Sequence, residues 1–510
     1  MVSRMSSVRE HAGVVAVAVL AFLVRLVPVL RGAGLRGLLG YDDGVYFAGA
    51  AALVSGRMPY RDFVLLHPPG ILLALAPFAA LARVTTDPTA LAVARVVFMA
   101  VGALNAALVL VVARRFGRLA GPLAGVLYAF WYGAVYAEHS TMLEPLAGAA
   151  VLVALAVLVQ PRRTPGTPAL LLAGIALGVA ADTKVWYAAT AVILILGELA
   201  LRRWRAALLV AVGALTSSVV IWLPFALTAP RQALHLVFLD QLGRTRAAST
   251  PWARLAKTVS ASTTGSVRHD AVLAVGALMV VGVMAAAVRH SALRVVAVVV
   301  AADIALILGA PVFFRHYAAL VAGPLLILMG VGLDDLVHLR VRRRRAPAPG
   351  RTGELRWARA AAAWALVAGV LAATYDPAAF GRPFPTATLA PAVAGVPCVT
   401  ADEPATLAVL DVLTSDLRHG CALPVDLTGQ TYGADAVRTA NGHHVARARN
   451  PRWQLALSEY LMSGQRLVLT RGRGTGIGHA LAHVIARSPV VASARGIRVR
   501  ATHSGPTGPP

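Results

Sequence analysis

Long apolar runs separated by short polar turns make up most of the first 374 residues of this chain. A helix needs about 20 apolar residues to cross a bilayer, so runs of this length predict membrane-spanning helices. We predict about eleven of them. They lie near residues 14–30, 90–113, 119–136, 142–160, 168–181, 185–201, 207–227, 271–288, 294–311, 317–336 and 360–374. The predicted fold class is therefore an α-helical polytopic membrane protein.

The composition agrees with this pattern and argues against nucleic acid as a partner. Of the 510 residues, 58% are apolar and 14% are charged, whereas a soluble domain is about 25% charged. The formal net charge is +25, but the arginines form one cluster for each pair of apolar runs rather than a single patch. Positive loops on the cytoplasmic side of a membrane explain that spacing. The clusters lie at residues 114–118, 162–163, 202–205, 289–294 and 340–345.

The arginine clusters also predict the orientation in the plasma membrane. With a cytoplasmic N-terminus, every cluster lies inside, and an odd number of spans leaves the C-terminal segment outside. The first apolar run has no clear cleavage site, so we interpret it as a retained signal anchor. The short apolar stretch 70–82 is left out of the count, because including it would invert every later loop. We expect a re-entrant or interfacial helix there.

Two long loops and a final segment of different composition are predicted to lie on the outer side of the membrane. We expect interfacial helices in the loops 31–89 and 228–270. After the membrane unit 1–374, residues 375–510 are more polar and richer in glycine and proline, which predicts a small extracytoplasmic α/β domain. Within it we expect strands at 396–400 and 467–470 and a helix at 453–462.

Two further features of the C-terminal segment bear on its structure. Cys398 and Cys421 are the two cysteines of the chain, and on the outer side a disulfide between them is expected. The glycine-rich run 472–478 fits no GxGxxG register, and we interpret it as a flexible loop.

Carboxylates predicted at the outer face are the candidate catalytic groups. Asp42 and Asp43 are adjacent, and mutual repulsion near a low-dielectric boundary raises the pKa of one member of such a pair. A base tuned in this way deprotonates an acceptor hydroxyl near neutral pH. Glu138 and Glu144 flank the outer end of a hairpin, where glutamates usually face a polar cavity. The alternatives are a solvated acidic turn for the pair and helix capping for Glu144.

Cationic residues on the same side are candidates for binding a lipid phosphate. His67 precedes two prolines that fix an extended entry to the next apolar stretch, and Arg57 and Arg61 lie close to it in sequence. Such a cluster suits an anionic headgroup. The alternative is a plain turn with local ion pairs. The complete candidate set is His67, Arg57, Arg61, Lys184, Arg315 and His316.

The order of these motifs resembles the GT-C glycosyltransferase superfamily. An N-terminal span, an outer acidic pair, a Pro-Pro junction with an apolar helix, a basic cytoplasmic turn and a second outer acid follow one another. The run 174–184, which ends in Thr183 and Lys184, is the most family-like stretch. The resemblance covers roughly residues 10–340. It is nearest to the branch that holds protein O-mannosyltransferases and lipid A aminoarabinose transferases.

The resemblance implies an active site at the extracytoplasmic membrane face, a polyprenyl-monophosphate sugar donor and inversion at the anomeric carbon. Asp42 matches the first acid of the family's pair, the expected catalytic base, and Asp43 matches its neighbour. Glu144 matches the second outer acid, with Glu138 as a rival. His67 departs from the pattern, because some relatives carry a lysine before Pro-Pro that contacts the lipid phosphate. The other candidate cations could supply that charge.

The sequence leaves alternatives open for the cofactor, for the sugar that is transferred and for the functional class of the protein. No metal-ligand spacing is apparent, also at His443, His444 and His479, so we expect no obligatory metal, although some superfamily branches use a divalent cation. A mannosyl- or arabinosyltransferase acting on a glycan, lipid or protein is the leading hypothesis. The alternatives are a transporter or flippase of lipid-linked sugars, which usually shows two related halves, and a glycan ligase that uses a polyprenyl-diphosphate donor.

Overall fold

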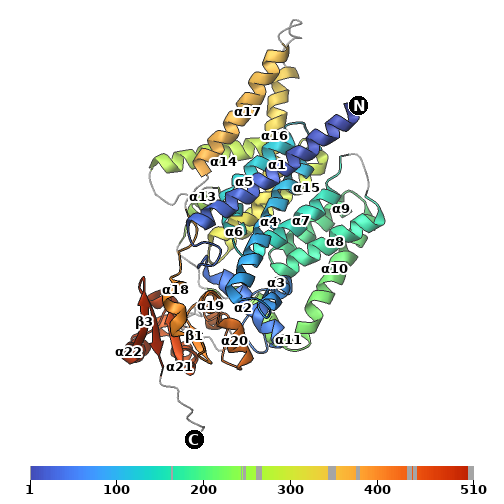
Figure 1. Cartoon of the computed structure of the whole chain (residues 1–510). Helices are drawn as coiled ribbons and strands as arrows, with labels where there is room; N and C mark the ends of the chain where they lie inside the picture. Colours follow the sequence, from blue (N-terminus) through green and yellow to red (C-terminus); the bar gives the residue numbers. More distant parts are fainter. Residues whose placement is uncertain are drawn as a thin grey trace.

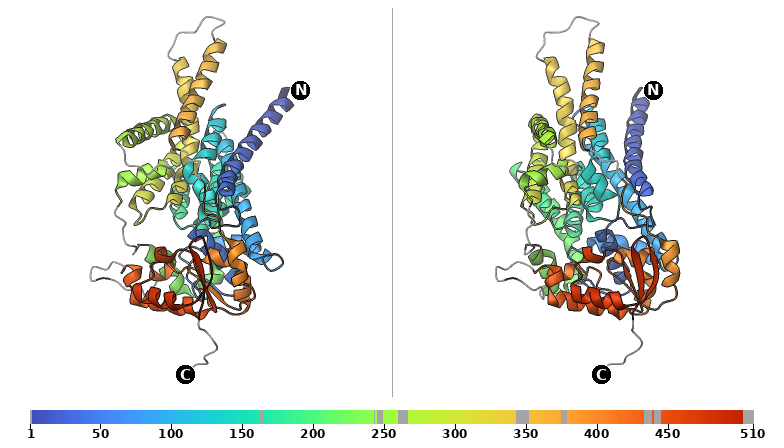
Figure 2. Two further views of the ribbon diagram at one scale, coloured as in Figure 1. Left: turned by 60° about the vertical axis from the view of Figure 1, so that its left-hand side comes forward. Right: turned by 90° about the vertical axis from the view of Figure 1, so that its left-hand side faces the viewer.

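The computed structural model describes residues 2–161, 165–242, 244, 249–259, 267–342, 352–374, 379–432, 439 and 445–502. A bundle of apolar helices forms most of the molecule, and a small unit with a β-sheet packs against one end of it (Figure 1). The two further views agree that the N-terminus lies at the end of the bundle that is far from this unit (Figure 2).

Twelve helices lie at the eleven stretches for which the sequence predicts spans, because the stretch 119–136 holds two of them. They are α1 (Val2–Arg31), α4 (Asp87–Ala113), α5 (Ala120–Phe130), α6 (Tyr132–Glu138), α7 (Leu143–Leu158), α8 (Thr167–Thr183), α9 (Tyr187–Ala200), α10 (Trp204–Ala226), α14 (Val267–Ala287), α15 (Arg294–Gly309), α16 (Ala319–Arg342) and α17 (Thr352–Thr374). Within the described residues, five helices are long and apolar enough to cross a membrane. The protein is a multi-pass membrane protein, and eleven crossings remain a prediction.

The helix pair α6 and α7 is bent by 117°, so it is either a sixth, broken span or a re-entrant loop. The sequence predicts that α6 is the end of one span, 119–136, and that α7 is a separate span, 142–160. In the structure, α6 and α7 are joined through this sharp bend. Residues 139–142 form this break, and their backbone leaves the helical path. Backbone that is not helical at membrane depth is tolerated where it lines a cavity or is buried in protein.

The short apolar stretch after the two prolines forms α3 (Gly70–Leu81), as predicted. At 12 residues it is too short to cross a bilayer alone. Its first residue lies against the end of α8, since a Cβ on Gly70 would be 2.6 Å from the Asp182 carbonyl oxygen. This close contact places the segment before α3, which contains His67, near the end of α8, which Lys184 follows.

Helix α2 (Tyr41–Val54) lies between the bundle and the C-terminal unit and is buried from Asp43 to Ala52. One hydrophobic core includes side chains of α2, α3 and α19 (Pro404–Val409). The contact of α2 with α19 is close, because a Cβ on Gly44 would lie 2.3 Å from the Ala405 backbone nitrogen. Glycine at this position therefore allows the C-terminal unit to dock.

The C-terminal unit contains a four-stranded sheet with the order β1-β2-β4-β3. Its strands are β1 (Val399–Ala401), β2 (Arg466–Leu469), β3 (Val490–Ala494) and β4 (Ile497–Ala501). β1 pairs with β2 in parallel, and the other pairs are antiparallel. Helices α21 (Pro451–Ser463) and α22 (His479–Arg487) belong to the same unit. The predicted helix and the second predicted strand are confirmed, whereas β1 begins three residues later than expected and β3 and β4 were not predicted.

Several short helices connect these parts. In the second outer loop they are α11 (Pro230–Leu234), η1 (His235–Leu239), α12 (Asp240–Leu242) and α13 (Pro251–Val259), and in the C-terminal unit they are α18 (Thr386–Leu389) and α20 (Leu413–Arg418). The helices of the outer loop agree with the sequence, and their interfacial position remains a prediction.

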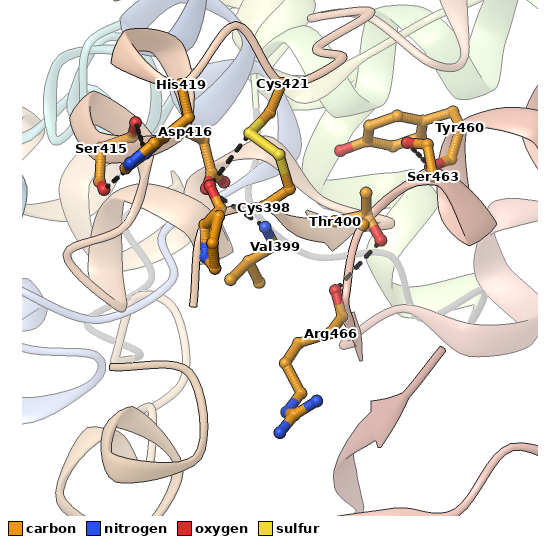
Figure 3. The surroundings of a disulfide bond; sticks show 12 residues. Cys398, Val399, Thr400, Ser415, Asp416, His419, Cys421, Tyr460, Ser463 and Arg466 are labelled. Carbon is orange, nitrogen blue, oxygen red and sulfur yellow. Dashed lines mark hydrogen bonds between the residues drawn. A yellow bond between two sulfur atoms is a disulfide. The ribbon is translucent and has the colours of Figure 1, made fainter. Parts of the chain in front are cut away.

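The predicted disulfide is confirmed. Cys398 and Cys421 are bonded, with their Cα atoms 5.6 Å apart, and the bond joins the start of β1 to the residues after α20 (Figure 3). Asp416 of α20 accepts a hydrogen bond from the Val399 backbone nitrogen at 3.2 Å, beside this bond. The disulfide and the hydrogen bond together fix α20 against the edge of the sheet.

Candidate active site between the helical bundle and the C-terminal unit

A cavity of about 540 Å³ lies where α2, the α6–α7 break and the C-terminal unit meet. Its wall comes from the first turn of α2, the segment before α3, residue 244, α13, residues 313–317 and four side chains of the C-terminal unit. Segments that are far apart in the sequence thus enclose one space.

Asp42, in the first turn of α2, is a half-buried carboxylate on the cavity wall. Burial raises the pKa of Asp42 to about 6, and the nearby carboxylates of Asp426 and Glu144 add to the rise. The cations Arg244 and Lys184 oppose it. A carboxylate with this pKa is ionised at neutral pH and is a stronger base than an ordinary aspartate, which suits proton abstraction.

Asp43, the next residue, points away from the cavity into the protein. Its carboxylate is fully buried, pairs with Arg95 of α4 and accepts hydrogen bonds from Thr141 N at 3.0 Å and Thr141 Oγ1 at 2.8 Å. Burial alone would raise the pKa of Asp43, but the Arg95 charge and these hydrogen bonds hold it below its usual value. Successive residues on a helix point about 100° apart, so the two neighbours face different surroundings.

Glu138 at the end of α6 does not line the cavity. It is 1% exposed, forms an ion pair with Arg25 of α1, and accepts hydrogen bonds from Asn105 Nδ2 at 2.7 Å and Tyr128 Oη at 2.8 Å. This network ties α1, α4, α5 and α6 together inside the bundle. The glutamate therefore has a set of partners within the helices.

Glu144 and Lys184 form a buried ion pair directly behind the cavity wall. The Lys184 ammonium lies 4.5 Å from the centre of the Tyr317 ring, and the Glu144 carboxylate lies 3.9 Å from His316 Nε2. Tyr317 and His316 both line the cavity. The pair thus supports the wall and contributes to the electric field at Asp42 without facing the space itself.

The candidate phosphate-binding residues separate into two groups. His67, Arg315 and His316 line the cavity. Arg57 instead donates to the Cys421 carbonyl oxygen at 2.8 Å, and Arg61 forms an exposed ion pair with Asp62. Burial lowers the pKa of His67 well below its usual value, as do the charges of Lys184, Arg244 and His316, so His67 is neutral at pH 7.

Five cavity residues with a permanent charge are absent from the set predicted by sequence. Asp426, Arg447 and Arg471 come from the C-terminal unit, and Arg244 and Lys257 come from the second outer loop. None belongs to a recognisable motif, and the three C-terminal residues reach the cavity only because their unit docks on α2. The lone lysine of the outer loop was the one available signal, because lysine is rare in this arginine-rich chain.

Tyr41 joins the two halves of the site. Its hydroxyl donates to Asp426 Oδ1 at 3.0 Å and accepts from the Thr428 backbone nitrogen at 3.1 Å. The Arg471 guanidinium lies 4.4 Å from the centre of the Tyr41 ring. Burial and the Asp426 charge raise the pKa of Tyr41 well above its usual value, so the phenol stays protonated and keeps this contact.

No group of three His, Cys, Asp or Glu side chains is placed to hold a metal ion among the residues that the structure describes. The carboxylates on the cavity wall in that part of the chain are Asp42 and Asp426. The site as described thus combines a basic carboxylate with several fixed cations, an arrangement that can deprotonate a hydroxyl and stabilise phosphate charge.

Comparison with known proteins gives matches among solved structures only. No protein-family model and no curated protein matches the sequence. ArnT from Cupriavidus metallidurans in the apo state aligns with a TM-score of 0.61 and 18% identity, over 97% of this chain and 98% of that chain. ArnT bound to undecaprenyl phosphate gives a TM-score of 0.54 and 17% identity, over 98% and 99% of the two chains.

An archaeal protein matches with a similar TM-score. The oligosaccharyltransferase AglB from Archaeoglobus fulgidus, in complex with an inhibitory peptide and a dolichol-phosphate, gives a TM-score of 0.59 at 13% identity, over 92% of this chain and 70% of that chain. This chain has the GT-C fold. The resemblance read from the sequence is thereby confirmed for the fold. The likeness in fold to ArnT extends to the C-terminal unit, since the alignment covers nearly all of both chains.

Proposed function

We propose that this protein is a membrane glycosyltransferase that transfers a sugar from a polyprenyl monophosphate to an extracytoplasmic acceptor. The observation that carries the proposal is Asp42, a carboxylate with a raised pKa on the wall of a cavity that several fixed cations also line. The match to ArnT bound to undecaprenyl phosphate adds a structural relative that holds a lipid of this class.

In the proposed reaction, the acceptor hydroxyl oxygen attacks the anomeric carbon of the donor sugar while its proton passes to Asp42. The bond between the anomeric carbon and the phosphate oxygen breaks, and the electron pair stays on the departing polyprenyl phosphate. Attack from the face opposite this bond inverts the anomeric carbon. Lys257 and Arg315 stabilise the charge that develops on the phosphate, since fixed cations do so without reorganising.

The neighbouring buried groups have supporting roles in this proposal. Asp43 with Arg95 anchors the first turn of α2, and thereby fixes the direction of Asp42. Glu144 with Lys184 holds the wall that carries His316 and Tyr317. Glu138 with Arg25 holds the bundle beneath it.

The proposed orientation places the cavity at the outer face of the plasma membrane. The N-terminus is cytoplasmic, eleven helices cross, and residues 375–510 are extracytoplasmic. The disulfide supports this orientation, because such bonds persist in oxidising compartments.

The test is transfer of radiolabelled mannose and arabinose from their polyprenyl monophosphates to cell-envelope extract by purified protein. We expect label to reach the acceptor with wild type and with Asp62→Asn, an exposed control, and turnover to fall about 10²–10⁴-fold with Asp42→Asn. Full activity of Asp42→Asn would remove the base assignment. We expect no obligatory metal, and parallel assays with EDTA or Mg²⁺ test whether a divalent cation contributes.

The two alternative classes give other outcomes in the same assay. Transfer only from polyprenyl-diphosphate donors would favour the glycan ligase. No transfer from any donor by folded protein, with lipid-linked sugar crossing proteoliposomes, would favour the flippase.

A further inference from the structure

The cations on the cavity wall come from two different parts of the chain. Arg315, Lys257 and Arg244 belong to segments of the helical bundle and its outer loop, whereas Arg447 and Arg471 belong to the C-terminal unit. A donor phosphodiester carries one negative charge. Within the described wall, five permanent cations outnumber the two carboxylates Asp42 and Asp426. The cavity thus keeps positive charge that one phosphodiester does not neutralise.

Arg471 is held in place by a buried carboxylate below it. Asp402, which is fully buried, accepts hydrogen bonds from the backbone nitrogens of Thr470, Arg471 and Gly472 at 2.7–3.0 Å. It also accepts from the hydroxyls of Thr470 and Thr475, both at 2.9 Å. The sequence predicts a flexible loop over residues 472–478, and in the structure the start of this run forms the short 3-10 helix η7 (Gly472–Thr475), held by these hydrogen bonds. Both carboxylate oxygens of Asp402 accept hydrogen bonds from this loop, so Asp402 fixes the backbone that carries Arg471.

The guanidinium of Arg471 has donor capacity left over. It lies over the Tyr41 ring and lines the cavity, and its Nη1 is buried with no hydrogen-bond partner among the described residues. A buried donor without a partner is unfavourable and is rare in folded proteins. An anion bound in the cavity beside Tyr41 would satisfy it.

Arg447 is tied to the same loop. Gln454 of α21 donates from its amide nitrogen to the carbonyl oxygens of Arg447 and Gly476, each at 2.9 Å. Its amide oxygen accepts from the Gly478 nitrogen at 2.8 Å. Gly476 has a φ of +91°, and a Cβ there would lie 2.9 Å from the Arg447 Cβ, so the two segments touch. Arg447 and Arg471 therefore lie on two segments that contact each other and are held together by hydrogen bonds.

We propose that Arg447 and Arg471 bind the acceptor, and that the acceptor is anionic, with a carboxylate or phosphate group near the hydroxyl that receives the sugar. Guanidinium groups match such anions with paired hydrogen bonds. This inference rests on the proposed function. It assigns the donor phosphate to the cations of the membrane unit, where the polyprenyl chain lies, and the acceptor charge to the unit outside the bundle.

Binding measurements on the full chain in lipid nanodiscs test the proposal. The protein is first saturated with undecaprenyl phosphate and then titrated by calorimetry with tetragalacturonate, with a phosphorylated tetrasaccharide, or with a neutral tetrasaccharide. We expect wild type to bind at least one anionic probe and not the neutral one. The two anionic arms tell carboxylate from phosphate recognition. No binding of either anionic probe to wild type would overturn the proposal.

The variants assign the site to its arginines. Arg447→Gln with Arg471→Gln should weaken binding of the anionic probe at least about tenfold, because charge-assisted hydrogen bonds are roughly twice as strong as neutral ones. Arg418→Gln, an exposed arginine that does not line the cavity, should bind like wild type. Arg471→Lys keeps the positive charge but loses the paired hydrogen bonds of the guanidinium, so its affinity for the anionic probe should be intermediate. Unchanged affinity in the double variant, at wild-type thermal stability, would overturn the proposal.

Undecaprenyl-phosphate affinity separates this inference from the proposed function. It should be unchanged in the double variant and reduced in Arg315→Gln. If the double variant loses undecaprenyl phosphate instead, these arginines bind the donor and the inference is wrong. If wild type binds the anionic probe but no polyprenyl phosphate, the proposed donor fails while the anion site stands.

Discussion

The interior of the helical bundle and the wall of the cavity use charge in opposite ways. Inside, three of the buried carboxylates have a cation of their own, in the pairs Arg25–Glu138, Arg95–Asp43 and Lys184–Glu144. On the described wall, cations outnumber carboxylates, and Arg471 keeps a buried donor without a partner.

This difference is informative because the acids look alike in the sequence. A buried ion pair leaves no charge for a ligand, and its loss unbalances the interior. Unmatched charge at a cavity is available for binding and catalysis. The two neighbours Asp42 and Asp43 show the contrast at the distance of one residue.

Arg25→Ala should give the largest loss of stability. It leaves the Glu138 carboxylate buried without its cation, and breaking such a pair lowers the free energy of unfolding by about 3–5 kcal/mol. Thermal unfolding in nanodiscs measures this. Replacing both partners, as in Arg25→Met with Glu138→Leu, should recover much of the loss. A single variant as stable as wild type would show that the interior pair does not hold the bundle.

Removal of the disulfide should follow in size. Cys398→Ser with Cys421→Ser frees a loop with a sequence separation of 23, which should lower the stability of the C-terminal unit by about 2–4 kcal/mol. Thermal unfolding of the variant should match that of reduced wild type. Labelling of both thiols in unreduced wild type would contradict the bond.

Gly44→Ala should weaken the docking of the C-terminal unit. The added Cβ would lie 2.3 Å from the Ala405 nitrogen, and overpacking of this kind destabilises by about 1–3 kcal/mol. Sugar transfer should fall as well, because the same contact brings Asp426 and Arg471 to the cavity. Gly13→Ala, where a Cβ meets nothing within 4 Å, is the matched control. Equal stability and transfer in the two variants would contradict the docking role.

Arg61→Gln should have the smallest effect, although the sequence made Arg61 a candidate for phosphate binding. The residue is exposed, pairs with Asp62 and lies off the cavity wall. Undecaprenyl-phosphate affinity, measured by calorimetry, should equal that of wild type, in contrast to Arg315→Gln. A clear loss of affinity in Arg61→Gln would move the donor site away from the cavity.

The helical architecture could be predicted from the sequence because apolar runs and arginine turns are local signals. Residue type also singled out Asp42, His67, Arg315 and His316, which do line the cavity. The local sequence pattern could not predict the direction in which each side chain points. Whether Asp42 or Asp43 faces the cavity depends on how α2 is seated against α4, through Arg95.

The contribution of the C-terminal unit was not predictable for a related reason. Asp426, Arg447 and Arg471 reach the site through tertiary contacts: Gly44 with Ala405, Val64 with Val425, and Tyr41 with Asp426. None of these contacts leaves a periodic or spaced motif. The glycine-rich run suggested a loop without suggesting that Asp402, seventy residues earlier in sequence, holds its start.

The most direct test of the central claim is the pH dependence of kcat/KM for sugar transfer in wild type and Asp426→Asn. Asp42 accepts a proton only when ionised, so in wild type kcat/KM should fall about tenfold for each pH unit below about 6. The Asp426 carboxylate raises the pKa of Asp42, so Asp426→Asn should move this limb to lower pH. A profile that is flat through pH 6, or a limb that does not move, would contradict the assignment of Asp42 as the base of this cavity.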